Sequence, residues 1–208
     1  MALISYPDSV DPVLLDLLSY VMQEIDLEPF LLGGGTSLSL RFGHRSSEDL
    51  DFFSREKFDT DRLQNCFADS FPDSQILNRT EGSICLLVQG NKIDFLYHPY
   101  PLLRKADIRE GSRFLSLPDI SAMKINAVTN RGSKKDFFDL YLLHQTGISI
   151  STSLDHFSMK YNGNRFLALR SLLWFEDADS EPDPILLNNW SWEYVKKEIA
   201  ELVDTIIS

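Results

Sequence analysis

The chain has 208 residues, 43% hydrophobic and 25% charged, a composition that excludes a disordered protein and allows a sizeable buried core. Acidic residues outnumber basic ones by 31 to 20, so the surface as a whole repels polyanions and any contact with nucleic acid must be local. The sequence has neither a secretory signal nor a run of about 18 apolar residues, so we expect a cytoplasmic protein with no membrane span.

The first half of the chain predicts a mixed α/β domain. Helical spacing of apolar residues, period-two alternation and Gly or Pro breaks define its elements. The expected order is a helix over residues 12–25, a strand over 29–32, a helix over 36–43, a strand over 49–53, a helix over 60–71, and strands over 83–89 and 92–97. Gly90-Asn91 suits the two-residue turn of a hairpin between the last two strands.

The second half predicts a helical bundle. A short strand is possible at Phe114-Leu115, and the composition then changes from mixed α/β to all-α. We therefore place a catalytic domain over residues 1–115 and a helical domain over 116–208, an α+β fold with a small mixed sheet. The expected helices cover residues 118–130, 134–145, 152–161, 164–177 and 191–206.

Three aspartates suggest a metal site. Asp49 and Asp51 lie at i and i+2 of one strand, so they share a face, and Asp94 on the hairpin can complete the set. Carboxylates are the ligands that Mg²⁺ prefers, and two such ions can neutralise the attacking and leaving oxygens of a phosphoryl transfer. The pattern predicts a site for Mg²⁺ or Mn²⁺, provided that the hairpin register keeps Asp94 on this face.

The glycine turn predicts where an NTP would bind. Gly33, Gly34 and Gly35 allow the backbone to approach phosphate oxygens, and the following helix N-terminus offers unpaired N–H groups. Thr36 and Ser37 add hydroxyl donors. A glycine turn alone is common, and so are paired acids on a solvated strand face. The order of turn, helix and acid-apolar-acid strand is what favours nucleotide chemistry.

The segment from Leu32 to Asp51 resembles the motif of the polymerase-beta-type nucleotidyltransferase superfamily, an apolar residue, two small residues and a later Asp-x-Asp. A closer resemblance is to the AbiEii-type nucleotidyltransferase toxins, and it spans residues 30–143. The residues that carry it are Gly34-Gly35-Thr36-Ser37-Leu38, His44-Arg45-Ser46-Ser47-Glu48-Asp49-Leu50-Asp51-Phe52-Phe53 and Lys134-Lys135-Asp136-Phe137-Phe138-Asp139-Leu140.

The resemblance implies further site residues. It places a lysine of the active site at Lys124 and an acid at Asp136 or Asp139, to orient that lysine or act as a base. The alternative is that Lys124 and Asp139 form a structural ion pair between packed helices.

Arg45 suits bidentate contact with phosphate. For Arg131, contact with phosphate and a structural role both stay open. We expect His44 to cap the preceding helix, and Cys66 and Cys85 to be buried thiols.

The resemblance also implies a reaction: transfer of a nucleoside monophosphate from an NTP to an acceptor hydroxyl, with release of pyrophosphate. It suggests a toxin that acts on a tRNA 3′ end or other RNA and is neutralised by an antitoxin. Two alternatives stay open at this point. One is transfer to a small hydroxyl-bearing molecule such as an antibiotic. The other is a module that binds a nucleotide or a partner without turnover, although all three carboxylates are present.

Overall fold

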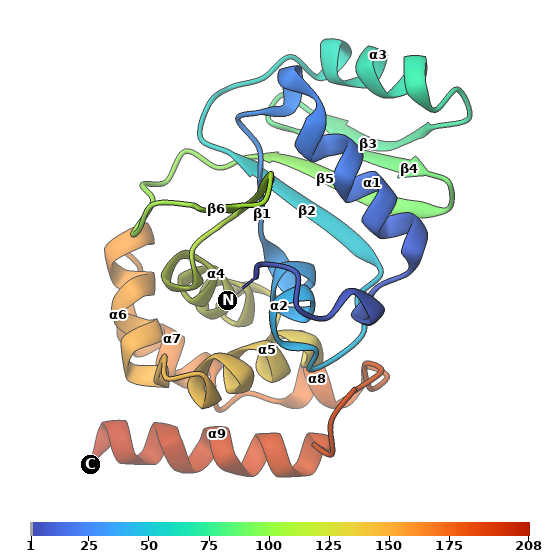
Figure 1. The fold of residues 1–208 in the computed structure, drawn as a ribbon. Coiled ribbons are helices and arrows are strands. Elements are labelled where there is room, and N and C mark those ends of the chain that lie inside the picture. Colours follow the sequence, from blue (N-terminus) through green and yellow to red (C-terminus); the bar gives the residue numbers. More distant parts are fainter. Residues whose placement is uncertain (1) are drawn as a thin grey trace. The chain divides into compact units, whose positions relative to one another are not determined.

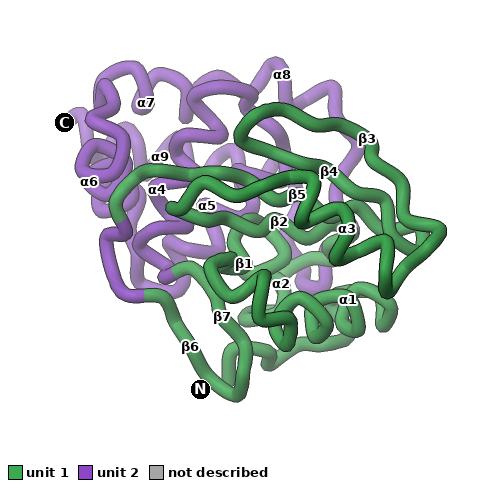
Figure 2. Tube along the Cα trace, turned by 90° about the horizontal axis from the view of Figure 1, so that it is seen from above, with its two compact units in different colours: residues 1–101, 106–115 green, residues 102–105, 116–208 purple. Residues whose placement is uncertain are grey.

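The computed structural model describes residues 2–208, which form two compact units (Figure 2). Unit 1 comprises the residues up to Pro101 and Ala106–Leu115, and unit 2 comprises Leu102–Lys105 and Ser116–Ser208. The chain therefore contributes Leu102–Lys105 to unit 2 before Ala106–Leu115 completes unit 1. None of the helices in residues 2–208 has the length and apolar character needed to span a membrane.

Unit 1 is built on a mixed sheet of seven strands in the order β3-β4-β5-β2-β1-β7-β6 (Figure 1). The central strand β2 pairs antiparallel with β1 and parallel with β5. The strands are β1 (Leu31–Leu32), β2 (Asp49–Ser54), β3 (Gln75–Thr80), β4 (Ser83–Val88), β5 (Asn91–Tyr97), β6 (Asp107–Arg109) and β7 (Ser112–Phe114).

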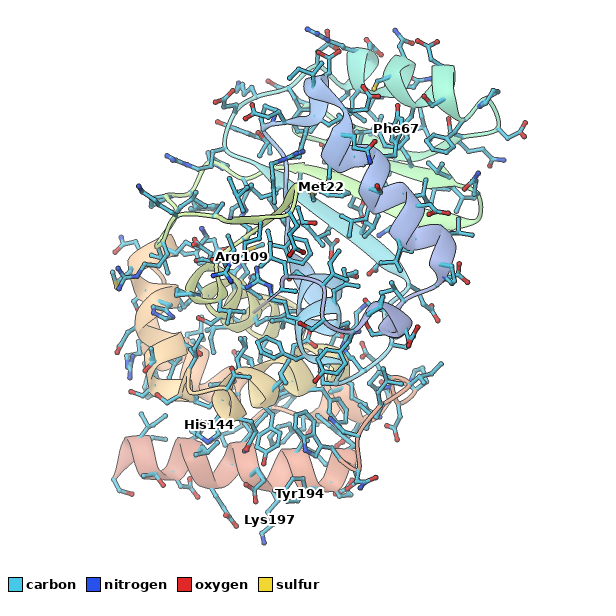
Figure 3. The ribbon with its side chains drawn as sticks, in the orientation of Figure 1. Met22, Phe67, Arg109, His144, Tyr194 and Lys197 are labelled. Carbon is cyan, nitrogen blue, oxygen red and sulfur yellow. The ribbon has the colours of Figure 1, made fainter. Side chains whose placement is uncertain are left out.

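Helices α1 (Pro12–Gln23) and α3 (Thr60–Ser70) cover one face of this sheet, where the labelled Met22 and Phe67 lie (Figures 1 and 3). Both begin as expected, because Asp11 and Asp59 accept hydrogen bonds from the first turn. Alternate residues of the central strands, such as Phe52 and Phe95, are fully buried against them. Burial of this face fixes which strand residues remain for the other face.

Short helical segments complete unit 1. Helix α2 (Gly34–Phe42) follows β1 directly and begins two residues earlier than predicted. It ends at Gly43, whose left-handed conformation is the usual helix stop. The 3-10 turns η1 (Pro7–Ser9) and η2 (Ile25–Leu27) flank α1, so the first predicted helix ends at Gln23 rather than at residue 25.

The hairpin turn lies one residue earlier than the sequence predicts. Val88 pairs with Asn91, so Gln89 and Gly90 form the turn, both with positive φ. The shift does not move Asp94 to the wrong face, because Ile93 and Phe95 on either side of it are both buried in the core. The alternation within the strand determines the face of Asp94 independently of the turn.

Unit 2 is helical, as predicted. Phe137, Trp192 and Val195 are among the buried residues that form its core. The predicted helix over residues 164–177 is wrong in its middle, because the chain there forms two short helices separated by a tight turn. The helices are α4 (Leu117–Asn130), α5 (Lys134–Gln145), α6 (Ile150–Tyr161), α7 (Arg165–Ser171), α8 (Glu176–Asp179) and α9 (Trp192–Ile207).

Candidate active site

Three aspartates lie on one face of the sheet of unit 1. Asp49 and Asp51 alternate with the buried Leu50 and Phe52 along β2, so they point away from the core. On the adjacent strand β5, Asp94 is the direct partner of Asp51 in parallel register. All three carboxylates are partly accessible to solvent, and together they form an acidic surface over two neighbouring strands.

The glycine turn lies beside this acidic surface. The Gly33 N–H donates to the carbonyl of Asp51 over 2.9 Å, which joins the start of α2 to β2. Gly34 has φ +62°, and a Cβ atom added to it would overlap the Asp51 carboxylate. A glycine is therefore required on two grounds, the left-handed backbone and the close approach of Asp51. The N-terminus of α2, which has no side-chain cap, is held next to the carboxylates.

The two hydroxyl residues after the turn are buried and hydrogen-bonded within unit 1. Thr36 Oγ1 donates to the carbonyl of Asp49 and lies 2.7 Å from Ser47 Oγ, so it ties α2 to the start of β2. Ser37 Oγ donates to the carbonyl of Gly34 over 2.9 Å. These bonds fix the turn relative to Asp49. Contact of Thr36, Ser37 and Gly35 with a nucleotide remains a prediction.

Two residues lie beside Asp94 that the sequence alone does not place there. Lys92 Nζ lies 2.6 Å from Asp94 Oδ2, and this hydrogen bond raises the lysine pKa. Cys85, the antiparallel partner of Asp94 on β4, is buried on the same face. Burial, followed by the hydrogen bond to Asp94, raises the pKa of its thiol to about 11. Period-two alternation in Lys92-Ile93-Asp94-Phe95 was the available signal for Lys92.

The donor set around β2 suits a hard divalent cation. Asp49, Asp51 and Asp94 offer carboxylate oxygens from one face, which is the ligand type that Mg²⁺ and Mn²⁺ prefer. Among residues 2–208 no three such side chains already converge in a coordinating arrangement. The Asp94 carboxylate pairs with the ammonium group of Lys92. The residue types of the three side chains fit a hard divalent cation.

Arg45 and His44 lie in the loop between α2 and β2, and both are buried. The Arg45 guanidinium donates to the carbonyl of Ser46 over 3.0 Å, a bond within the loop that leads to β2. Contact between Arg45 and phosphate remains a prediction. His44 follows the left-handed Gly43 that ends α2.

In unit 2 the lysine and the two acids that the family resemblance implies are in contact. Lys124 Nζ of α4 lies 2.9 Å from Asp136 Oδ1 and 2.6 Å from Asp139 Oδ2 of α5. Arg131 also pairs with Asp136, at 2.8 Å from its Nε. Burial opposes ionisation of Asp136, but the charges of Lys124 and Arg131 outweigh it, and the pKa of Asp136 lies below its ordinary value. The two acids and the lysine thus form one buried charged cluster.

The lowered pKa of Asp136 predicts a pH dependence of stability. The ion pairs of Asp136 contribute fully above its ordinary pKa of 3.8 and are lost as the pH falls below that value toward the lowered folded-state pKa. The unfolding free energy of wild type, measured with urea, should therefore fall more steeply on acidification than that of Asp136→Asn. Asp204→Asn, at an exposed position of α9, should keep the wild-type slope. Equal slopes for wild type and Asp136→Asn would contradict the assignment.

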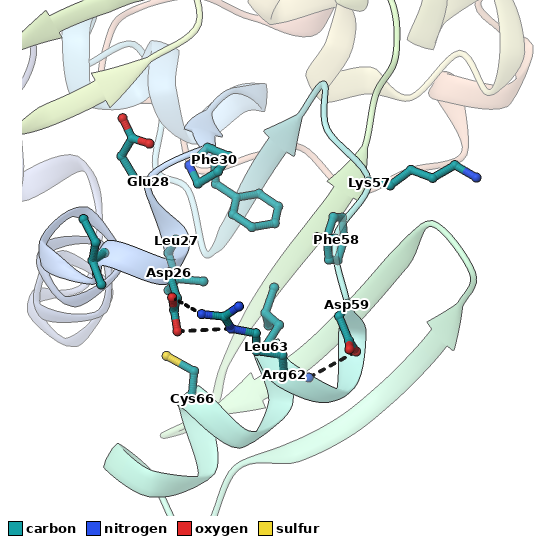
Figure 4. Close-up of a pocket in the computed structure, with 12 residues that line it drawn as sticks. Asp26, Leu27, Glu28, Phe30, Lys57, Phe58, Asp59, Arg62, Leu63 and Cys66 are labelled. Atoms are coloured by element: carbon teal, nitrogen blue, oxygen red, sulfur yellow. Dashed lines mark hydrogen bonds and ion pairs between the residues drawn. The ribbon is translucent and has the colours of Figure 1, made fainter.

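A separate pocket of about 360 Å³ lies in unit 1 (Figure 4). Phe30, Phe58 and Leu63 form its apolar part, and the Arg62 guanidinium is paired with Asp26 at its edge. None of the predicted site residues lines this pocket.

Comparison with known proteins finds relatives of this chain. The family described as nucleotidyl transferase AbiEii toxin, type IV TA system, matches residues 16–81, which include the glycine turn, Asp49 and Asp51. A protein of Aquifex aeolicus (strain VF5), named as uncharacterized protein aq_aa25, is 32% identical over 183 residues, covering 84% of this chain and 88% of that protein.

Solved structures share the fold. A putative nucleotidyltransferase from Helicobacter pylori has a TM-score of 0.60 at 21% identity, with 92% of each chain covered. MenT4, a nucleotidyltransferase toxin from Mycobacterium tuberculosis H37Rv, has a TM-score of 0.57 at 15% identity, covering 92% of this chain and 83% of MenT4. The predicted α+β fold is therefore confirmed as the nucleotidyltransferase fold.

Proposed function

Because this chain belongs to the AbiEii-type nucleotidyltransferase family, we propose that it transfers a nucleoside monophosphate from an NTP to an acceptor hydroxyl in a metal-dependent reaction. The observation that carries this proposal is the register of β2 and β5, which sets Asp51 beside Asp94 on one face next to the Gly34 turn. A carboxylate set and a phosphate-binding turn are the two parts that the reaction requires.

The residues of unit 1 have separate tasks in this proposal. Asp49, Asp51 and Asp94 hold Mg²⁺ or Mn²⁺, which supplies neutralising charge at the attacking and leaving oxygens when bound. The turn at Gly34 and Gly35 holds the triphosphate through backbone N–H groups, aided by the hydroxyls of Thr36 and Ser37. The acceptor oxygen forms its bond to the α-phosphorus as the bond to the β-phosphate oxygen breaks, and pyrophosphate leaves. Arg45 contacts a phosphate oxygen.

The charged cluster of unit 2 has a second task. Lys124 provides a compact positive charge for the triphosphate, and Asp136 and Asp139 hold its ammonium group in place. Because the lowered pKa of Asp136 makes it a weak base, its role in this proposal is to orient Lys124. The ion pairs of Lys124 Nζ with Asp136 and Asp139 support the orienting role of the two acids.

For the acceptor we propose RNA, such as the 3′ end of a tRNA, and for the biological role a toxin that a cognate antitoxin neutralises. The matched family is described as a toxin of a type IV system, and MenT4 is named as a nucleotidyltransferase toxin. One observation favours a second candidate. Most of the acidic excess of the chain lies in unit 1, which suits a cationic hydroxyl-bearing small molecule better than a polyanion.

The test is transfer of label from each α-labelled NTP. Wild-type protein is incubated with Mg²⁺ and either total RNA or a set of aminoglycosides, with Asp49→Asn as the control for contaminating enzymes. We expect labelled RNA that depends on one or a few NTPs, disappears with a chelator and returns with added Mg²⁺ or Mn²⁺. Label on the small molecules alone would select the second candidate. A wild-type protein that transfers no label and binds no NTP would refute the proposal.

A further inference from the structure

The face of the sheet that carries the three aspartates continues into a row of apolar and aromatic side chains. Along β2 the alternation that puts Asp49 and Asp51 on this face next puts Phe53 there, and all three are partly buried. Along β5 the same alternation leads from Asp94 through Leu96, and two residues later comes His98. Phe53 and Leu96 are direct partners in the parallel register.

Three rings of this row contact one another. The Phe53 and His98 rings meet edge to face with centroids 5.5 Å apart, and the His98 and Tyr100 rings lie 4.8 Å apart. The backbone N–H of His98 donates to the carbonyl of Ser54 over 2.7 Å, which extends the pairing of the two strands by one residue. Tyr100 is 41% exposed, so one ring of the row faces solvent. We call Phe53, His98 and Tyr100 the aromatic row.

The aromatic row is held next to the glycine turn. A Cβ atom on Gly33 would lie 2.6 Å from Cε2 of Phe53, whereas one on Gly34 would overlap Asp51. The turn therefore spans both parts of the face, with the carboxylate on one side and the ring on the other. Phe53 comes two residues after Asp51, about 7 Å along the strand, and the His98 ring lies next to it with centroids 5.5 Å apart. The rings therefore begin about one ribose length from the aspartates and extend away from them.

We propose that the aromatic row stacks the nucleobase of the incoming NTP, so that the phosphates lie over the aspartates and the glycine turn while the base lies over His98 and Tyr100. This inference rests on the proposed function and adds the part of the site that contacts the base. Aromatic rings suit this role because every base has a π-face to stack. Selection among the bases then depends on the groups around the rings and not on the metal site.

The test is equilibrium binding in the presence of Mg²⁺ and the absence of acceptor, with the four NTPs and inorganic tripolyphosphate as probes. Wild type should bind its preferred NTP about ten-fold or more tighter than tripolyphosphate. His98→Ala and Tyr100→Ala should each weaken NTP binding about five- to ten-fold and leave tripolyphosphate binding unchanged. Tyr100→Phe, which keeps the ring, should restore NTP affinity.

The matched control is Trp174→Ala, which removes an aromatic ring that is 53% exposed in unit 2 and should leave both affinities unchanged. Equal losses of NTP and tripolyphosphate in His98→Ala and Tyr100→Ala would overturn the inference, because the rings would then act through the fold. Unchanged NTP affinity with a raised KM for the acceptor RNA would also overturn it, since the stacked base would belong to the acceptor.

Loss of base stacking and loss of nucleotidyl transfer give different binding results. If wild type binds NTP and tripolyphosphate equally well, and Asp51→Asn loses both, the phosphate and metal part stands and only the aromatic row is wrong. If wild type binds neither probe, both proposals are refuted.

Discussion

Replacing Gly34 with alanine is expected to reduce nucleotidyl transfer about a hundred-fold or more, because a misplacement of about 1 Å at a reacting centre costs that much. The added Cβ atom would overlap the Asp51 carboxylate and push it out of its position on the acidic surface. The positive φ of Gly34 adds strain of about 1–2 kcal/mol for any residue with a Cβ atom. Activity and stability should therefore both fall.

The matched control is Gly90→Ala. Gly90 has φ +83° in the hairpin turn, and its added Cβ atom would have no atom within 4 Å. It shares the backbone strain but not the contact, so it should lose about 1–2 kcal/mol of unfolding free energy and keep its transfer rate. Both rates are measured by label transfer from NTP, with Asp51→Asn as the reference for full loss. Equal activity of the two alanine variants would refute the role given to the contact with Asp51.

Replacing Asp119 with alanine is expected to lower the unfolding free energy of unit 2 by about 3–5 kcal/mol, since it leaves a buried ammonium group without its carboxylate. Asp119 Oδ1 lies 2.8 Å from Lys160 Nζ, and both side chains are fully buried. The same carboxylate accepts hydrogen bonds from the backbone N–H groups of Leu103 and Arg104 and from Ser116 Oγ. One side chain therefore joins α4, α6 and the segment Leu102–Lys105.

Urea unfolding followed by tryptophan fluorescence measures this loss selectively, because all three tryptophans of the chain lie in unit 2. The matched control is Asp155→Ala, which breaks the more exposed ion pair of Asp155 with Arg165 on the same unit and should cost only about 0–1 kcal/mol. An Asp119→Ala variant within about 1 kcal/mol of wild type would contradict the expected role of the buried pair.

The acidic surface could be predicted from the sequence because it depends on alternation within single strands. Asp49 and Asp51 alternate with Leu50 and Phe52, and burial of the apolar residues leaves the aspartates no other face. The face of Asp94 follows in the same way, although the turn lies one residue earlier than predicted. The alternation of polar and apolar residues along one strand can be recognised in a sequence. The exact position of a turn depends instead on which backbone positions accept positive φ.

The features that the sequence did not reveal depend on neighbours distant along the chain. The missed strands β3 and β6 lie at the two edges of the sheet, where few side chains are buried and alternation is weak. The break between α7 and α8 contains neither Gly nor Pro, so no local signal marked it. The contact of Cys85 with Asp94 depends on the pairing of β4 with β5, which spacing alone does not fix.

The chain passes from unit 1 to unit 2 and back before Ser116, and this order limits where the protein can be cut into separate fragments. Unit 1 needs β6 and β7, which come after Leu102–Lys105 have already joined unit 2. A fragment that stops at Pro101 would leave β1 as an open sheet edge, whereas one that starts at Ser116 would leave Asp119 without its backbone donors from Leu103 and Arg104. The two units are therefore poor candidates for gene fission or for exchange as modules, and they are expected to be inherited as a single piece.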